Sequence, residues 1–363
     1  MSKNIFENLF VLEIANNHWG CVDRGVKIIK DFAKVIRFNN VKAAIKIQIR
    51  DVDNFIHKDF HNSKDIRYIK KTMDTKLSKE SYAKLVETIK ENSCITMATP
   101  FDEKSVHDCV DLGIELIKIA SSDINDWVLI EEIAKTKKPV IVSTGGSSLK
   151  DIDDLVKFFQ NRSIPLAINH CVSIYPSQKH ELDLNQIDFL KQRYPDHVIG
   201  YSTHEYDEGV ELPIMMAYAK GARTFERHVD IDYDKDSGKC VSPYCSNPEN
   251  LDKWVKAYKK AVEICGSVGE QRRIIPKKET KYLDALVRGV YAKKNLKKGD
   301  KITEEDVYLA VPLQKGQISC RELMAGEVLL KEIKKDKQIN IDDIDSPYAK
   351  NKELQEIIYK RGI

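Results

Sequence analysis

The chain of 363 residues has no long hydrophobic run. No stretch approaches the roughly 20 apolar residues that a membrane-spanning helix needs, and the amino terminus lacks the apolar core and small-residue cleavage site of a secretory signal. These absences predict a soluble, cytoplasmic protein without a membrane partner. The 59 basic and 56 acidic residues leave a net charge of only +3, so nucleic acid is not expected as a partner.

Cysteines are few and scattered, with eight in the whole chain. Several lie within apolar segments, a pattern typical of reduced thiols in a protein core and not of a disulfide framework. These are Cys94, Cys109, Cys171 and Cys265. Cys240 and Cys245 lie five residues apart in a loop, but without a second cysteine pair a zinc site is not favoured there.

Strand-like and helix-like segments alternate along the first 266 residues. The strand-like segments are Leu9–Asn16, Ala43–Ile49, Cys94–Pro100, Leu116–Ser122, Pro139–Gly146, Pro165–Cys171, Val198–His204 and Ala222–Val229. Helical periodicity lies between them, over Val22–Phe38, Lys79–Glu91, Glu103–Leu112, Leu149–Phe159, Asn185–Arg193, Val210–Ala219 and Pro248–Cys265. The alternation predicts a (β/α)8 TIM barrel of the α/β class. An open doubly wound sheet is the alternative, but the first strand-to-helix turn lacks Gly-x-Gly-x-x-Gly.

Each predicted strand ends in polar residues, and the carboxyl ends of barrel strands are where active sites lie. These residues are Glu13, Asn16, His18, Lys46, Gln48, Thr99, Lys118, Ser121, Ser143, Thr144, His170, Ser173, Ser202, His204, Glu226 and His228. Taken singly, a serine or threonine there usually caps the next helix, and a lysine is usually a solvated edge residue. Their recurrence on all eight strands favours a functional rim.

His204 and His228 close consecutive predicted strands. Because side chains two apart on a strand share a face, Ser202 points with His204 and Glu226 points with His228. The two imidazoles are therefore candidate ligands of one divalent ion. Such a site suits manganese, our first choice, with cobalt or magnesium as alternatives. The alternative for each histidine is a structural role.

Lys46 and Lys118, surrounded by hydroxyl groups, predict a cradle for a phosphorylated carboxylate, because ammonium groups supply charge and hydroxyls supply directional hydrogen bonds. Either lysine could instead form a Schiff base, as in an aldolase, if it were desolvated and neutral. Glu13 is a candidate for holding sugar hydroxyls or moving a proton. The residues by themselves leave these alternatives open.

The composition changes after Cys265. We expect a catalytic barrel over residues 1–266, a linker over 267–287, a small β-rich domain over 288–345 and a C-terminal tail over 346–363. The small domain contains an internal repeat, with one copy beginning at Val290 and the other at Val328. Each copy is typical of strand, turn, strand and a helical turn, so the domain is expected to be pseudo-symmetric.

Several short motifs, in their order along the chain, resemble those of bacterial sialic acid synthases, the phosphoenolpyruvate-dependent nonulosonic acid synthases. They are Glu-Ile-Ala-Asn-Asn-His from Glu13, Ile-Lys-Ile-Gln from Ile45, Thr-Pro-Phe-Asp-Glu from Thr99, Ile-Lys-Ile-Ala-Ser from Ile117, Val-Ser-Thr-Gly from Val142, His-Cys-Val-Ser-Ile-Tyr-Pro from His170, Gly-Tyr-Ser-Thr-His from Gly200 and Glu-Arg-His from Glu226. Residues 288–344 resemble the antifreeze-like (SAF) domain that follows the barrel in that family.

The resemblance implies condensation of phosphoenolpyruvate with the open-chain aldehyde of an amino sugar such as N-acetylmannosamine, giving a nine-carbon 2-keto acid and phosphate. It also implies a domain-swapped homodimer, in which the small domain of one subunit covers the barrel mouth of the other. By matching position, the resemblance implies that the phosphoenolpyruvate carboxylate is bound by Lys46 and Thr99, and that its phosphate is bound by Lys118, Ser121, Ser143, Ser173 and Ser202. It implies that the metal is bound by His204 and His228. The residues that would face the sugar are Glu13, Gln48, Phe101 and Tyr175.

Four departures from the family pattern stand out. Ser173 replaces an asparagine, Thr203 replaces an aspartate, the loop over residues 230–246 lacks Gly-Pro-Asp, and Val311 replaces an arginine that contacts the N-acetyl group in the family. We interpret the changes as lying on the sugar side, which predicts an altered acceptor. Two further hypotheses remain: a Schiff-base aldolase of pyruvate and a sugar aldehyde, and a non-catalytic carbohydrate-binding protein that acts through its SAF domain.

Overall fold

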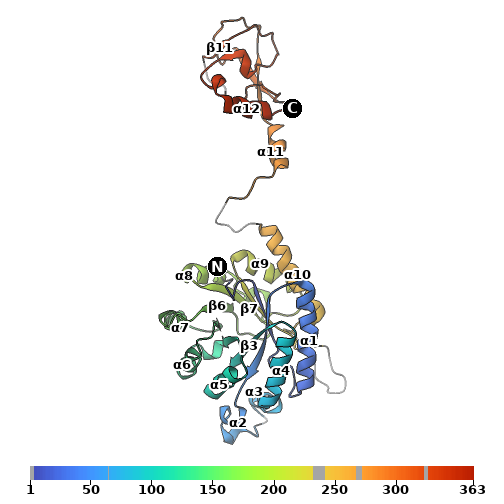
Figure 1. Ribbon diagram of the computed structural model, residues 1–363, viewed down its shortest axis with the longest axis vertical. Helices are drawn as coiled ribbons and strands as arrows, with labels where there is room; N and C mark the ends of the chain where they lie inside the picture. The colour runs from blue at the N-terminus through green and yellow to red at the C-terminus, as the bar shows by residue number, and fades with distance from the viewer. Residues whose placement is uncertain (1–3, 64, 232–241, 267–271, 323–325) are drawn as a thin grey trace. The chain divides into compact units, whose positions relative to one another are not determined.

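The computed structural model describes residues 4–63, 65–231, 242–266, 272–322 and 326–363. The chain divides into two compact units, Met1–Gly266 and Ser267–Ile363. Each is described here by itself (Figure 1). No helix within the described ranges is both long and apolar enough to cross a lipid bilayer.

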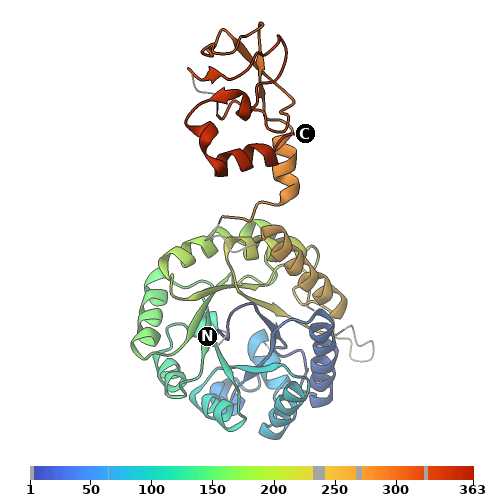
Figure 2. The same cartoon turned by 45° about the horizontal axis from the view of Figure 1, so that its top comes forward.

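The first unit is a closed barrel of eight parallel strands in sequence order, with β8 paired to β1. The closure confirms the predicted TIM barrel and rules out the open doubly wound sheet; the ring of strands and the outer ring of helices are visible in Figure 2. The strands are β1 (Leu9–Glu13), β2 (Ala43–Ile49), β3 (Ile95–Pro100), β4 (Leu116–Ile119), β5 (Val140–Ser143), β6 (Leu166–Cys171), β7 (Val198–Thr203) and β8 (Thr224–His228).

The outer helices agree with the predicted periodicity to within two residues at each end, with three additions. They are α1 (Val22–Asn39), α2 (Val52–Phe55), α3 (Arg67–Asp74), α4 (Lys79–Glu91), α5 (Glu103–Asp111), α6 (Trp127–Lys135), α7 (Leu149–Asn161), α8 (Asn185–Arg193), α9 (Glu211–Lys220) and α10 (Pro248–Cys265). The periodicity missed α2, α3 and α6. In α6 the apolar residues Trp127 and Val128 are exposed while Leu129 and Ile130 are buried, so no single apolar stripe marks the helix.

The inward-facing side chains change from apolar to polar along each strand. At the amino-terminal end of the strands, Leu9, Val11, Met97, Leu116 and Ile141 pack in one buried cluster inside the barrel. Two residues further along their strands, Val11, Met97, Leu116 and Ile141 are followed by Glu13, Thr99, Lys118 and Ser143. Since residues two apart share a face, the barrel has an apolar floor and a polar mouth.

Helix caps come from residues other than the predicted site hydroxyls. In the first unit, α4, α5, α6, α7 and α10 each begin at a side chain that accepts a hydrogen bond from a backbone N–H of the first turn. These caps are Ser78, Asp102, Asp126, Ser148 and Asn247. The alternative role for the strand-end serines and threonines, as caps of the next helix, therefore does not apply to these five helices.

The second unit contains two antiparallel strand pairs over a small apolar core. Its elements are α11 (Lys277–Asp284), β9 (Gly289–Ala292), β10 (Val307–Ala310), β11 (Val328–Leu329), β12 (Ile344–Asp345) and α12 (Lys352–Lys360). The first copy of the internal repeat supplies β9 and β10, and the second supplies β11 and β12. Helix α11 lies within the segment interpreted as a linker, and α12 lies in the C-terminal tail.

All seven described cysteines are free thiols. Cys94, Cys109 and Cys171 are buried, as expected for core thiols. The prediction was wrong for Cys265, which is exposed because it ends α10 beyond the face that packs on the barrel. Cys240 lies outside the described residues, so the pair that it forms with Cys245 in the sequence is not described.

Candidate active site

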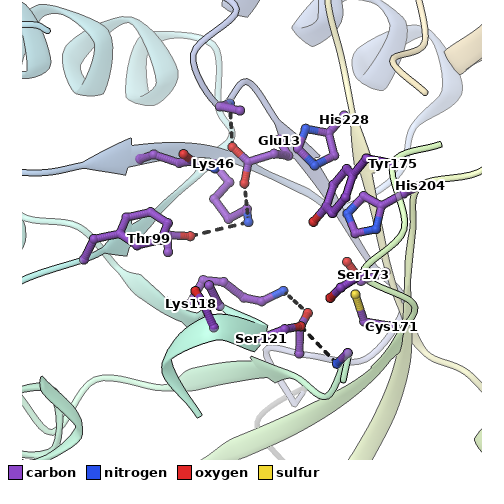
Figure 3. A pocket seen from close by; sticks show the side chains of 18 of the residues that line it. Glu13, Lys46, Thr99, Lys118, Ser121, Cys171, Ser173, Tyr175, His204 and His228 are labelled. Atoms are coloured by element: carbon purple, nitrogen blue, oxygen red, sulfur yellow. Dashed lines mark hydrogen bonds and ion pairs between the residues drawn. The ribbon is translucent and has the colours of Figure 1, made fainter. Parts of the chain in front are cut away.

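A cavity of about 740 Å3 opens at the carboxyl ends of the barrel strands. Its lining includes every residue predicted for the site, and Figure 3 shows most of them pointing into one space. These are Glu13, Lys46, Gln48, Thr99, Phe101, Lys118, Ser121, Ser143, Ser173, Tyr175, Ser202, His204 and His228. The fold thus brings together residues that are up to 215 positions apart in the chain, from 13 to 228.

Two lysines and two glutamates form a buried ion-pair cluster at the base of the cavity. Glu226 bridges the lysines, with its Oε1 2.7 Å from Lys46 Nζ and its Oε2 2.7 Å from Lys118 Nζ. Lys46 also pairs with Glu13, and its Nζ lies 3.4 Å from Thr99 Oγ1. Lys118 Nζ donates to Ser143 Oγ at 2.6 Å. The four charges cancel formally, so the side chains at the base of the cavity carry no net charge.

Burial and charge act in opposite directions on these groups. Burial opposes the charge on Lys46, but its ion pairs with Glu13 and Glu226 raise the lysine's pKa above its usual range. Burial also opposes ionisation of Glu226, but the two lysines hold the pKa of that carboxyl well below its usual range. For Lys118, burial lowers the pKa although Glu226 opposes the change.

A group of serines lies on the opposite side of the cavity from β1 and β2. The backbone N–H of Gly145 donates to Ser121 Oγ at 3.0 Å. A Cβ atom at Gly145 would collide with Ser173 Oγ and would press on Ser121 Oγ. A side chain at position 145 would therefore force the Ser173 hydroxyl to move, at a point where three strand-end loops approach each other closely. The result is a small polar pocket with hydroxyl groups beside the Lys118 ammonium.

The two histidines face the same cavity from β8 and from the first residue after β7. Their ring centroids lie 5.2 Å apart, and the Tyr175 ring lies 3.9 Å from that of His204. Burial, reinforced by His228, lowers the pKa of His204 to about 3, and burial, reinforced by Lys46, lowers that of His228 to about 3. Both rings are therefore neutral near pH 7. His204 Nδ1 lies 2.8 Å from the Val172 carbonyl oxygen and donates to it, which leaves Nε2 as a free electron-pair donor.

Thr203 does not face the acceptor, and our interpretation that it lies on the sugar side was wrong. Its neighbours Ser202 and His204 point inward, so its own side chain points outward, where its hydroxyl donates to Tyr201 Oη at 3.0 Å. The register pairs Thr203 with the fully buried Arg227 on β8. An acidic residue at 203 would therefore be placed beside Arg227 and away from the cavity.

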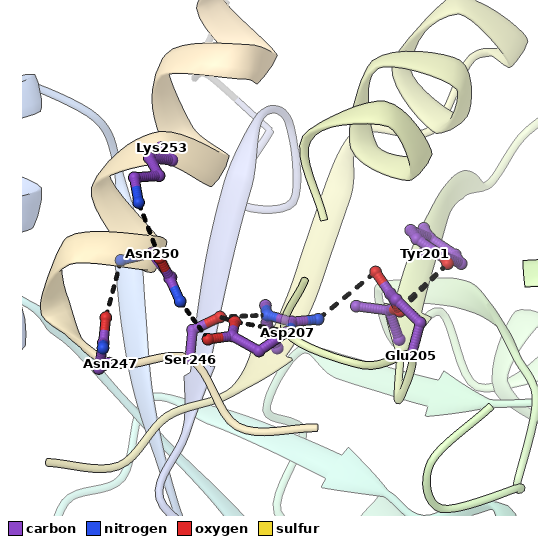
Figure 4. Close-up of polar contacts among 9 residues, drawn as sticks. Tyr201, Glu205, Asp207, Ser246, Asn247, Asn250 and Lys253 are labelled. Atoms are coloured by element: carbon purple, nitrogen blue, oxygen red, sulfur yellow. Dashed lines mark hydrogen bonds and ion pairs between the residues drawn. The ribbon is translucent and has the colours of Figure 1, made fainter. Parts of the chain in front are cut away.

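The buried Arg227 instead takes its acidic partners from the loop after β7. Its guanidinium lies 3.4 Å from Glu205 and 3.0 Å from Asp207, and its Nε donates to Ser246 Oγ at 2.5 Å. Figure 4 labels these three partner residues. Glu205 follows His204 and Arg227 precedes His228 in the chain. This network therefore ties together the two segments that carry the histidines.

Several cavity residues were not predicted as site residues. Glu226 was noticed only as sharing a face with His228, and its bridging position became visible with the fold. Arg50, Lys71, Asp123 and Tyr244 also line the cavity. Arg50 could have been found by continuing the alternation Lys46, Gln48 by one step, whereas Lys71 lies on α3, which the periodicity missed. Burial raises the pKa of Asp123 to about 6.

Some polar strand-end residues serve other purposes. His18 accepts a hydrogen bond from the Gly20 N–H at 3.1 Å, and His170 Nε2 lies 2.7 Å from the Leu182 carbonyl oxygen. His170 and Thr144 line a separate cavity. Residues 232–241 of the loop that departs from the family pattern lie outside the described residues. Val311 is exposed on the second unit.

Among the residues that the structure describes, no group of three or more histidine, cysteine or acidic side chains could hold a metal ion. The described residues therefore offer two neutral imidazoles as ligands at this site. Two imidazoles with oxygen ligands are a donor set that suits manganese, iron, cobalt or zinc. The residues present fit a divalent ion of this group.

The closed barrel with its charged mouth defines the molecule as a barrel enzyme. Comparison with known families then narrows the class. The NeuB family matches residues 35–270 and the SAF domain matches residues 287–345. The chain therefore belongs to the NeuB family, the nonulosonic acid synthases, and is an enzyme that forms carbon–carbon bonds.

Individual relatives agree with this assignment. The structure of a candidate spore coat polysaccharide biosynthesis protein E from Chromobacterium violaceum is 36% identical, with a TM-score of 0.87, and covers 94% of this chain and 100% of that one. An N-acetylneuraminic acid synthetase from Leptospira borgpetersenii is 26% identical, with a TM-score of 0.66, over 76% of this chain and 91% of its own. Pseudaminic acid synthase from Campylobacter jejuni is 28% identical over 84% of this chain and 87% of its own.

Proposed function

We propose that the protein condenses phosphoenolpyruvate with the open-chain aldehyde of an amino sugar, related to N-acetylmannosamine, to give a nine-carbon 2-keto acid and inorganic phosphate. The observation that carries the proposal is the juxtaposition, in one cavity, of two ion-paired lysines, a serine pocket and two neutral imidazoles. Relatives named as synthases of sialic acid and pseudaminic acid support this reaction class.

Phosphoenolpyruvate has two anionic ends, and the cavity has two cationic positions for them. Lys46 with Thr99 would bind the carboxylate. Lys118 would bind the phosphate, together with the hydroxyls of Ser121, Ser143, Ser173 and Ser202. Because Glu226 holds both ammonium groups, the entering anion would share the lysine protons with Glu226 and keep both lysines charged.

The reaction forms one carbon–carbon bond and breaks one carbon–oxygen bond. C3 of the enol attacks the aldehyde carbon, water adds at C2, and the bond between C2 and the phosphate oxygen breaks, so that phosphate leaves with the bonding electron pair. One proton of the added water goes to the aldehyde oxygen, which becomes a hydroxyl, and the other leaves with the phosphate, so that C2 becomes the keto carbon. Lys118 and the serines would stabilise the charge that collects on the departing phosphate.

His204 and His228 would hold a divalent ion, manganese as the first choice and cobalt or magnesium as alternatives. When bound, the ion supplies a Lewis acid for the aldehyde oxygen. Glu13, the register partner of His228 on the neighbouring strand, would accept hydrogen bonds from the sugar hydroxyls. Gln48, Phe101 and Tyr175 would complete the acceptor side of the cavity.

The charge arrangement disfavours a Schiff-base aldolase. A Schiff-base lysine must present a neutral amine to a carbonyl. Glu13 and Glu226 raise the pKa of Lys46, and Lys118, whose pKa is lowered by burial, still pairs with Glu226 at 2.7 Å. Borohydride trapping with pyruvate should therefore label neither lysine. A non-catalytic, carbohydrate-binding role is also disfavoured, because such a role would not require a neutralised pair of buried lysines.

We further propose a cytoplasmic homodimer in which the SAF domain of one subunit covers the barrel mouth of the other. The position of the cavity at the open carboxyl end of the barrel supports this proposal, because a second subunit could close it. Light scattering coupled to gel filtration should give twice the chain mass of 41.6 kDa. A monomer at all concentrations would contradict it.

The experiment that tests the function is incubation of the purified protein with Mn2+, phosphoenolpyruvate and a panel of aldoses. We expect release of phosphate together with a nine-carbon 2-keto acid, identified by mass spectrometry, from at least one amino sugar. The matched negative control is the same mixture without the sugar. Absence of product with every aldose would refute the synthase.

A further inference from the structure

The outer part of the cavity carries two cationic side chains that the phosphoenolpyruvate site does not use. Arg50 and Lys71 line the cavity from β2's carboxyl end and from α3. Within the described ranges of the chain, neither forms an ion pair with a carboxylate, in contrast to Lys46 and Lys118. The nearby Asp230 is already paired with Arg24 at 2.7 Å.

Arg50 lies closer to the opening of the cavity than Lys46. Lys46, Gln48 and Arg50 alternate along β2 and its continuation, so they share the inward face, and at about 3.3 Å per residue Arg50 lies roughly 13 Å further out than Lys46. Phe101, just after β3, lies two residues beyond Thr99 and therefore also shares the inward face. The aldehyde of an acceptor must lie beside phosphoenolpyruvate at the base, so the remote end of the sugar would reach this outer layer.

The guanidinium of Arg50 is held in one orientation with donors to spare. It lies over the Phe101 ring at 3.6 Å, and its Nη2 donates to Gln48 Oε1 at 3.0 Å. Its Nε is buried and has no hydrogen-bond partner among the described residues. A planar, stacked guanidinium with a free N–H is preorganised to bind a phosphate or carboxylate through two parallel hydrogen bonds.

A neutral sugar would not explain these groups. Hydroxyls and N-acyl groups are bound well by amides and neutral side chains, whereas the partly buried guanidinium of Arg50 is unfavourable without a counter-ion. Lys71 is exposed to solvent and adds a second positive charge at the edge of the cavity. The third charged group of the outer cavity, Asp123, lies on the β4 side and offers only one negative charge against the two cations.

We infer that the acceptor carries its own anionic group, a phosphate or a carboxylate at the end remote from the aldehyde, and that Arg50 and Lys71 bind it. The inference rests on the proposed function and specifies its substrate class. Phosphate and carboxylate share the chemistry that the two cations recognise. The substrate panel must therefore contain a sugar phosphate and a sugar carboxylate, so that the two anionic groups can be told apart.

The test compares kcat/KM for three acceptors, N-acetylmannosamine, its 6-phosphate and the corresponding 6-carboxylate, with formation of the 2-keto acid as the readout. Loss of a charged hydrogen bond changes an equilibrium about 10- to 150-fold. We expect kcat/KM for one of the anionic acceptors to exceed that for the neutral sugar by a factor in this range, mainly because its KM is lower. Equal or better use of the neutral sugar would overturn the inference and leave the proposed function intact.

Variants assign the effect to the two cations. Arg50→Gln and Lys71→Gln should each reduce the ratio of kcat/KM for the anionic over the neutral acceptor, and Arg50→Lys should restore part of it. The control is Arg162→Gln, because Arg162 is also stacked on a phenylalanine, 3.6 Å from the Phe158 ring, but lies just after α7 and outside the cavity. An equal decrease for all acceptors in Arg50→Gln would indicate a structural role and would contradict the inference.

If no acceptor gives product, the proposed function fails, and binding decides the inference separately. Calorimetric titration of the phosphoenolpyruvate-loaded protein with each of the three sugars measures the same preference without turnover. Tighter binding of an anionic sugar that is lost in Arg50→Gln would support the anion site. Absence of any preference would refute it.

Discussion

Lys118 and Glu226 meet across the inside of the barrel, with Nζ and Oε2 2.7 Å apart, although their strands β4 and β8 are not neighbours. Both side chains are almost completely buried. The second carboxylate oxygen of Glu226 pairs with Lys46, so one glutamate bridges two buried ammonium groups, and Glu13 supplies the second negative charge. This relationship makes the stability of the barrel depend on the occupancy of its site.

The first prediction concerns this bridge. Glu226→Gln should lower the free energy of unfolding by about 3–5 kcal/mol, because it leaves two buried ammonium groups with less compensation. Added phosphate should stabilise the variant more than the wild type, because the anion replaces the missing charge. Denaturation followed by tryptophan fluorescence measures the barrel alone, since the three tryptophans all lie within residues 1–266. Asp154→Asn, which removes an exposed ion pair with Lys150, is the control and should cost less than about 1 kcal/mol.

The second prediction concerns the serine pocket. Gly145→Ala should destabilise the protein by about 1–3 kcal/mol through overpacking and should raise KM for phosphoenolpyruvate. Adding Ser173→Ala removes the atom that the new methyl group meets first. The double variant should therefore regain thermal stability while its KM stays high. Recovery of both quantities, or of neither, would argue against the proposed pocket.

The third prediction concerns the exchange of acidic residues around Arg227. Glu205→Thr should destabilise the protein because the buried guanidinium loses one of its two carboxylate partners. Thr203→Asp places a carboxylate at the register partner of Arg227, so the double variant should recover part of the loss. A double-mutant cycle should give a coupling energy of about 0.5–3 kcal/mol. Strict additivity of the two changes would show that position 203 does not compensate for position 205.

The fourth prediction concerns metal binding. His204→Ala should abolish Mn2+ binding measured by calorimetry, together with turnover, while circular dichroism shows an unchanged fold. The control is His107→Ala, because His107 is largely exposed on α5, away from the cavity. Full turnover after chelation would rule out the metal role of His204 and His228.

The fifth prediction concerns pH. Burial, reinforced by Lys71, lowers the pKa of His18 to about 4, and its ring accepts a hydrogen bond from Gly20 that requires the neutral form. The unfolded state, with a pKa near 6.5, binds the proton first, so stability is full above about pH 6.5 and falls as the pH decreases toward 4. This term amounts to about 3 kcal/mol. Comparison of wild type with His18→Asn isolates it, and identical pH dependence of both proteins would contradict the assignment.

Patterns in the amino-acid sequence predicted the barrel and most of the polar residues at its carboxyl end. Alternation of strand and helix patterns predicted eight units, and the two-residue period of a strand predicted the inward-facing residues within the strands. The resemblance to the synthase family supplied others, among them Phe101 and Tyr175, and all thirteen residues line one cavity. The same rule, applied to Thr203, places its side chain outside. Helix α6 was missed because its apolar residues lie on two faces, and the periodic signal depends on one.

Tertiary structure alone decided how these residues pair. The bridge from Glu226 to Lys46 and Lys118 joins strands that are distant in sequence and across the barrel, and no local pattern encodes which carboxylate meets which ammonium group. The same holds for Arg227 with Glu205 and for Arg50 over Phe101. Strand periodicity fixes the direction of a side chain, whereas barrel closure fixes its neighbours, and ion pairing and metal binding depend on the neighbours.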